Sequence, residues 1–140
     1  MSTDKSAPRY ISKLSNKIRR EFDRSPVVRE ISPAESRVLY FMLDHEGDLF
    51  QRDIEEEYSM RAPSASALLK RMEADGLIRR MSIADDARYK KIEVTEKGAS
   101  HKDEVIAKIH KLESIVTEGI SEEDMEVFYR VVEKMIDNLP

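Results

Sequence analysis

The sequence predicts a mainly α-helical fold of the α+β class, with a single β-hairpin. Apolar residues recur at helical spacing along most of the 140 residues, as in Ile11, Leu14, Ile18 and Phe22. The segment 77–95 instead alternates apolar and polar residues, which is typical of two short antiparallel strands. A chain of this length removes roughly two-thirds of its unfolded surface from water, which is enough for a core without disulfides.

Seven elements are expected from these patterns and from the residues that cap them. A capping box at Ser32-Pro33-Ala34-Glu35 begins one helix, and Gly47, Gly76 and Gly119 stand where helices end. The expected order is helices at 9–24, 33–44, 50–58 and 62–75, a hairpin at 77–94, a long helix at about 96–118 and a final helix at 122–138. We expect residues 1–8 to be disordered.

Charge is distributed in blocks along the chain, although the net charge is only −4. Residues 1–24 and 61–91 each carry a net +4, whereas residues 25–60 and 92–140 each carry −6. Such asymmetry is typical of a basic functional face on an acidic scaffold, although solvated charged faces produce the same pattern.

The segment 61–74 has a helical wheel suited to nucleic acid. One face is apolar (Ala65, Leu68, Leu69 and Met72) and is predicted to pack inward. The opposite face presents small residues beside two cations: Pro63, Ser64, Ser66, Ala67, Lys70 and Arg71. Small side chains let a helix enter a major groove about 12 Å wide, and the cations reach phosphates or guanine acceptors. An ordinary amphipathic surface helix would give the same wheel.

The hairpin that follows is also basic. Its cations lie on both strands and at the tip: Arg79, Arg80, Arg88, Lys90 and Lys91. An Arg on a narrow projection suits the minor groove, and Asp86 stands close enough in sequence to orient Arg88 by a charge-assisted bond. A solvated hairpin with a local ion pair is the alternative. Two helices joined by a short turn and followed by such a hairpin predict a winged helix-turn-helix.

The sequence resembles the MarR-type (multiple antibiotic resistance regulator) family of winged-helix transcription regulators. The resemblance covers about residues 9–138 and rests on residues 63–80 (PSASALLKRMEADGLIRR), on Asp86-x-Arg88 and on residues 92–98 (IEVTEKG), with Val94 where the family commonly has Leu. It implies that Ser64, Ser66 and Lys70 face the major groove, and that Arg88, oriented by Asp86, enters the minor groove.

The resemblance also implies a domain organisation and a function. Residues 32–95 would form the DNA-binding winged helix, and residues 9–31 and 96–140 a helical dimerisation region. The apolar stripes at the chain ends independently exceed what one small core covers, which favours a homodimer. We expect a sequence-specific, homodimeric repressor that a small-molecule effector releases from a pseudo-palindromic operator, with half-sites spaced by roughly 10 bp. The alternative is a winged-helix module whose basic hairpin docks an acidic protein.

Effectors of this family are often small aromatic or phenolic acids held between the dimer helices and the winged domain. Candidates for such a site here are Tyr10, Arg37, Tyr40 and Met42, since rings and one cation suit an aromatic carboxylate. The alternative is that Tyr40 and Met42 belong to the core. Because the chain has no Cys, a thiol switch is excluded.

Other classes of protein find no support in the sequence. There is no P-loop, GxGxxG or GxSxG motif and no nucleophile–base arrangement, so we expect neither an enzyme nor a cofactor. His45, His101 and His110 lack the spacing of metal ligands, and no metal site is expected. No apolar stretch approaches the ~20 residues of a membrane helix, and a soluble, cytoplasmic protein is expected.

Overall fold

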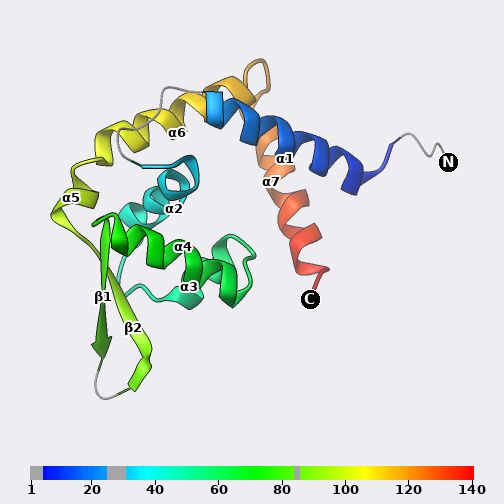
Figure 1. Cartoon of the computed structure of the whole chain (residues 1–140). Coiled ribbons are helices and arrows are strands. Elements are labelled where there is room, and N and C mark those ends of the chain that lie inside the picture. The colour runs from blue at the N-terminus through cyan, green and yellow to red at the C-terminus, as the bar shows by residue number, and fades with distance from the viewer. Residues whose placement is uncertain (1–4, 25–30, 84–85) are drawn as a thin grey trace.

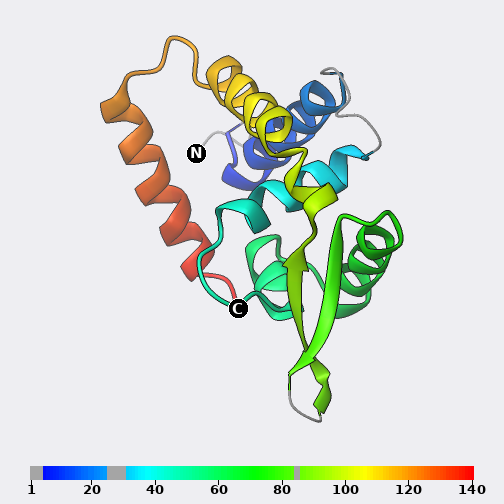
Figure 2. The same ribbon diagram turned by 90° about the vertical axis from the view of Figure 1, so that its left-hand side faces the viewer.

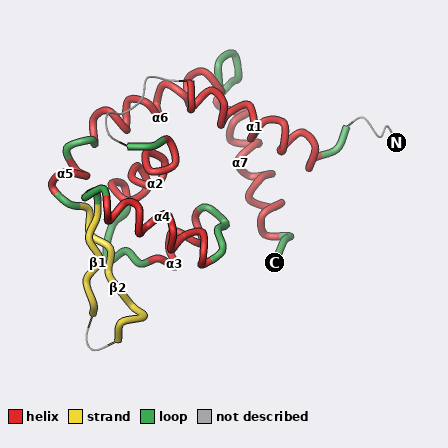
Figure 3. Tube along the Cα trace, viewed as in Figure 1, coloured by secondary structure: helices red, strands yellow, loops and turns green. Residues whose placement is uncertain are grey.

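The fold is known from a computed structural model, which describes residues 5–24, 31–83 and 86–140, with the backbone alone described for residues 83 and 86–89. The elements follow one another in the order α1 (Ala7–Arg24), α2 (Pro33–Asp44), α3 (Gln51–Glu57), α4 (Ala62–Ala74), β1 (Ile78–Ile83), β2 (Asp86–Val94), α5 (Glu96–Ala99), α6 (Lys102–Val116) and α7 (Glu122–Asp137). The predicted mainly helical fold with one hairpin is confirmed (Figure 3).

Helix α2 begins at the predicted capping box. The Glu35 amide donates to the Ser32 hydroxyl over 3.2 Å, and the Ser32 amide donates to Oε1 of Glu35 over 3.1 Å. Glu35 is only 2% exposed, and burial, together with the nearby Asp75 carboxylate, raises its pKa. The cap therefore fixes the start of α2, and its Glu35 lies close to Asp75 at the end of α4.

The core lies between α2, α3, α4 and the inner face of the hairpin. The four apolar residues predicted to face inward from α4 are all buried, at 5% exposure or less. The segment before α3 is tied to the hairpin because the Ile92 amide donates to the Leu49 carbonyl over 2.7 Å. Burial of such side chains contributes roughly 1.5–3 kcal/mol each. The core residues are Ile31, Val38, Leu39, Met42, Leu49, Ile54, Leu68, Leu69, Met72, Leu77, Ile78, Ile92 and Val105.

Thr95 joins the hairpin to the helices that follow it. Its hydroxyl donates to the Gly76 carbonyl over 2.5 Å and accepts from the Gly98 amide over 3.0 Å, while its own amide donates to the Leu77 carbonyl over 3.0 Å. Gly98 is buried against Leu77 and Val94, where a Cβ would collide with the Leu77 carbonyl oxygen. The turn that ends α4 and the turn that begins α5 are thus one packed unit.

Two differences from the sequence prediction matter here, and the remaining boundaries agree within two residues. The long helix expected at about 96–118 is divided into α5 and α6, because the chain tightens after Gly98: the His101 amide bonds to the Gly98 carbonyl, three residues back. Helix α1 begins at Ala7, so residues 7 and 8, expected to be disordered, are helical. The prediction of disorder for residues 1–4 lies outside the described residues.

The elements form a winged body with a helical layer on the side away from the hairpin tip. Helices α1 and α6 lie side by side across this layer, and α7 turns away from the end of α6 (Figures 1 and 2). No residue of α7 is buried. In the part of the chain that the structure describes, no helix is long and apolar enough to cross a membrane.

The junction at Gly98 makes a testable prediction about stability. Gly98→Ala places a methyl group against the Leu77 backbone, so we expect the free energy of unfolding to fall by about 1–3 kcal/mol, as overpacking does. Urea unfolding monitored by circular dichroism measures this change. Ala99→Ser, at the exposed neighbouring position, should change stability by less than about 0.5 kcal/mol. Equal effects of the two substitutions would contradict the assigned role of Gly98.

Candidate nucleic-acid interface

Helices α3 and α4 form a helix-turn-helix with a locally determined turn. The turn contains Ser59 at a φ of +48°, and the Met60 amide donates to the Glu55 carbonyl over 2.9 Å. The Gln51 side chain donates to the Ala62 carbonyl over 3.3 Å, which links the start of α3 to the start of α4. These bonds set the angle at which α4 leaves the body.

The outer face of α4 carries the side chains that are predicted from the sequence to contact DNA. Pro63, Ser64, Ala67, Lys70 and Arg71 are exposed, and Ser66 is half-buried. Lys70 and Arg71 make no ion pair or hydrogen bond with other described residues, so both cations are available. The helix therefore presents small side chains and two available cations on one side, as the helical wheel predicted.

Two features beside α4 were not predicted. Arg61, the residue before the helix, is exposed at its N-terminal end and adds a third cation. A hollow runs between α4 and the start of α2, and its walls are mostly apolar, formed by Ala34, Met60, Ser64, Ala67, Leu68 and Arg71. Arg61 could have been identified from the sequence, because it stands immediately before the helix.

The hairpin projects from the body as a two-stranded antiparallel wing (Figures 1 and 2). Arg79 and Lys90 are exposed on opposite strands, and the Arg79 guanidinium pairs with the Glu93 carboxylate at 3.3 Å. Asp86 and Arg88 lie in β2, but their side chains, predicted to act at the tip, lie outside the described residues.

Arg80 lies on the face of the hairpin opposite to that of Arg79 and Lys91. Its side chain is 14% exposed and its guanidinium bonds to the Glu73 carboxylate over 3.2 Å. This hydrogen bond lowers the pKa of Glu73, which keeps the carboxylate charged. Arg80 thus fastens β1 to α4, and its guanidinium is engaged within the chain instead of being presented outward.

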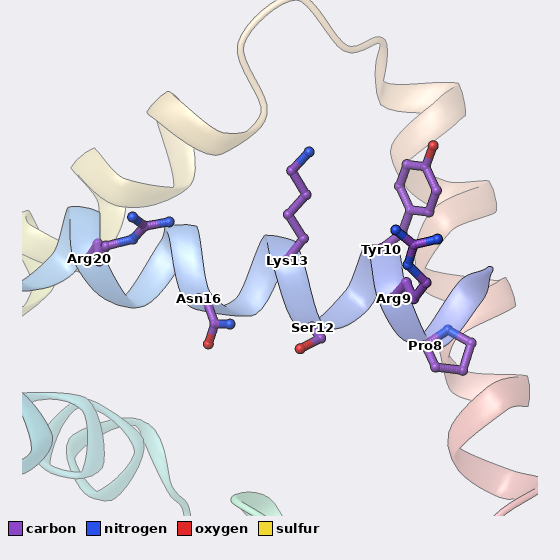
Figure 4. Close-up of a pocket in the computed structure, with 7 residues that line it drawn as sticks. All are labelled: Pro8, Arg9, Tyr10, Ser12, Lys13, Asn16 and Arg20. Carbon is purple, nitrogen blue, oxygen red and sulfur yellow. The ribbon is translucent and has the colours of Figure 1, made fainter. Parts of the chain in front are cut away.

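The four residues predicted for an effector do not share a pocket within one chain. Tyr10 lies on an open groove along α1, among Pro8, Arg9, Ser12, Lys13, Asn16 and Arg20 (Figure 4). Tyr40 lines a separate cleft of about 220 Å³ with Leu43, Asp44, Lys102, Ile106 and His110. Met42 is 5% exposed and belongs to the core, as the alternative interpretation held.

Arg37 instead contacts a buried ring together with a cation that sequence reasoning missed. The Phe22 ring of α1 lies 4.0 Å from the Lys108 ammonium and 5.3 Å from the Arg37 guanidinium. Lys108 is only 8% exposed and has no hydrogen-bond or ion-pair partner among the described residues. Burial lowers its pKa, the nearby Arg37 lowers it further, and Asp23 opposes both. The sequence signal for this contact was the position of Lys108 within the apolar stripe that contains Val105 and Leu112.

The three histidines lie apart in the fold. His45 bonds through Nε2 to the Asp48 carbonyl, His101 is buried at the start of α6, and His110 lies in the cleft beside Tyr40. Within residues 5–24, 31–83 and 86–140, no three His, Asp or Glu side chains are grouped to hold a metal ion.

A helix-turn-helix whose second helix runs directly into a projecting two-stranded hairpin defines a winged helix-turn-helix protein. Residues 30–88, which hold this unit up to the wing, match the model of the MarR family. The resemblance to the MarR family of transcription regulators seen in the sequence is confirmed over this segment.

Solved structures share the fold over nearly the whole chain. The S. aureus MepR–DNA complex matches with a TM-score of 0.84 at 24% identity, over 96% of this chain and 99% of that one. A putative MarR family regulator from Listeria monocytogenes, complexed with a 26mer DNA, matches with a TM-score of 0.85 at 17% identity, over 96% and 89%. BpsR from Bordetella bronchiseptica, whose DNA binding is regulated by 6-hydroxynicotinic acid, matches with a TM-score of 0.82 at 13% identity, over 98% and 97%.

Proposed function

We propose that this chain is a sequence-specific DNA-binding regulator, a homodimeric repressor that a small organic anion releases from its operator. The observation that carries the proposal is the joint exposure, on α4, of small side chains and of cations that make no ion pair with other described residues, directly beside a basic wing. Two relatives of the same fold were solved with DNA, which supports the same use of this surface here.

Different side chains of α4 suit two roles, positioning the helix on the duplex and reading the base sequence. Lys70 and Arg71 reach phosphates or guanine edges, whereas the hydroxyls of Ser64 and Ser66 donate to or accept from bases at close range. Ala67 adds an apolar contact that suits a thymine methyl group. The roles of Arg88 and Asp86 at the wing tip remain predictions from the sequence.

Exposed apolar residues at both ends of the chain support a homodimer. Tyr10, Ile11 and Leu14 of α1 are between 42% and 56% exposed, and no residue of α7 is buried. Helix α1 has six basic and two acidic residues, and α7 has the reverse. Opposite charges and two apolar faces make these helices complementary partners for a second copy.

The buried cation at Lys108 supports a site for an anionic effector. The Lys108 ammonium is buried against the Phe22 ring with no hydrogen-bond or ion-pair partner among the described residues, and a carboxylate placed against Arg37 and Lys108 would neutralise both charges. BpsR, whose DNA binding responds to an aromatic acid, shows that a protein of this fold supports such regulation. An effector acts by preferring the dimer arrangement that does not fit the operator, because equal affinity for both arrangements would shift nothing.

The DNA-binding proposal is tested by substitutions on α4. Lys70→Ala should weaken binding to all duplexes and reduce the slope of log K against log salt by about 0.9, as expected for one lost phosphate contact. Ser66→Ala should change the sequences selected from a random duplex library more than it changes the salt slope. Fluorescence anisotropy and library selection measure the two effects. If the unmodified protein binds no duplex at low salt, the result favours the alternative, a winged-helix module whose basic hairpin docks an acidic protein.

The homodimer is tested on the apolar face of α7. Val131→Glu places a charge in the centre of that face, and its desolvation should weaken self-association by roughly 100-fold or more. Sedimentation velocity at micromolar concentration would then show a monomer. Glu133→Gln, on the polar side of the same helix, serves as the control and should stay dimeric. A monomeric unmodified protein would refute the homodimer.

The effector site is tested with benzoate as a probe and neutral benzamide as its control. Lys108→Met should weaken benzoate binding by at least about tenfold, because it removes a charge-assisted contact. Calorimetry measures the affinity, and a duplex-release assay shows whether benzoate acts on DNA binding. If Lys108→Met and the unmodified protein bound benzoate with equal affinity, Lys108 would be excluded from the site.

A further inference from the structure

One face of the wing holds two cations, Arg79 and Lys91, and the carboxylate of Glu93. In the antiparallel register Arg79 lies opposite Glu93, and Met81 lies opposite Lys91. Because alternate residues of a strand share a face, these four side chains lie on the same side of the hairpin. Met81 is 44% exposed, so this side is open to solvent.

The Glu93 carboxylate is shared by the two cations. Its Oε2 lies 3.3 Å from Nε of Arg79, and its Oε1 lies 3.9 Å from Nζ of Lys91. Lys91 has a second partner in Asp48, whose Oδ1 is 3.2 Å from Nζ. Two carboxylates, one from β2 and one from the loop before α3, therefore hold both cations at the base of the wing.

Three cations elsewhere on the candidate interface lack such partners. Lys70, Arg71 and Lys90 are exposed and make no ion pair with any other described residue. Positive charge available to a phosphate is thus concentrated on α4 and on Lys90, further out along the wing. The base of the wing carries positive charge that is already neutralised.

We propose that Glu93, assisted by Asp48, is a specificity-determining residue that restrains Arg79 and Lys91 from contacting DNA phosphates. This inference rests on the proposed DNA binding. Affinity for arbitrary sequences comes almost entirely from phosphate neutralisation and counterion release, so each restrained cation lowers non-specific affinity. The contacts that remain come mainly from α4, where base edges can be read. Exposed ion pairs contribute little to stability, so these carboxylates affect DNA binding more than folding.

The experiment compares Glu93→Gln with Glu96→Gln in the full-length protein. Glu96 is exposed at the start of α5, close to the base of the wing, and has no ion-pair partner among the described residues, so its substitution makes the same change in charge without freeing a cation. Affinity for a duplex of scrambled sequence is measured by anisotropy between 50 and 200 mM salt. Asp48→Asn provides a second variant outside the wing.

Glu93→Gln should steepen the salt slope by about 0.9, because it frees one cation, Arg79, while Lys91 keeps Asp48 as a partner. This corresponds to an additional loss of affinity of about 3- to 4-fold across that salt range. Asp48→Asn should produce a smaller change, because Lys91 keeps Glu93 as a partner. Glu96→Gln should leave the slope close to that of the unmodified protein.

Two results would overturn the inference while leaving the proposed function intact. The first is a salt slope for Glu93→Gln equal to that of the unmodified protein. The second is an equal change in Glu93→Gln and Glu96→Gln, which would reflect total charge alone. If the unmodified protein showed no salt-dependent affinity for any duplex, the proposed DNA binding would itself fail.

Discussion

The Thr95 hydrogen bonds are the constraint on which the rest of the structure depends. One hydroxyl joins the turn that ends α4 to the turn that begins α5, and the missing side chain of Gly98 lets these turns pack together. The Lys97 ammonium adds a bond to the Asp75 carbonyl at the same place. Any movement of the α5–α6 layer is therefore carried to α4 and to the base of the wing, because no flexible linker separates them.

The fold was largely predictable because its signals are local. The capping box at Ser32, the glycines at helix ends and the apolar spacing each reflect backbone geometry within one element. The division between α5 and α6 was not predictable in this way. It arises where Gly98 packs against Leu77, which is distant in sequence, and apolar periodicity does not record such a contact.

The candidate interface on α4 was predictable for the same reason, since exposure on a single helix follows from its wheel. The wing was less predictable. Alternation alone would place Met81 inward, yet Met81 is exposed and Arg80 is covered, because Glu73 on α4 offers Arg80 a partner. The cluster of Phe22, Arg37 and Lys108 was not predicted. Its residues come from α1, α2 and α6, and only tertiary structure brings these helices together.

The absence of any buried residue in α7 has a consequence for the cell that makes the protein. In the proposed homodimer, this helix would gain its stability from association with a second copy, so the fraction of chains in the functional form would depend on total concentration. Newly made chains at low copy number would expose this helix to proteases and chaperones until they meet. The onset of regulation would then follow the square of the chain's abundance, and the protein would act above a threshold of its own expression.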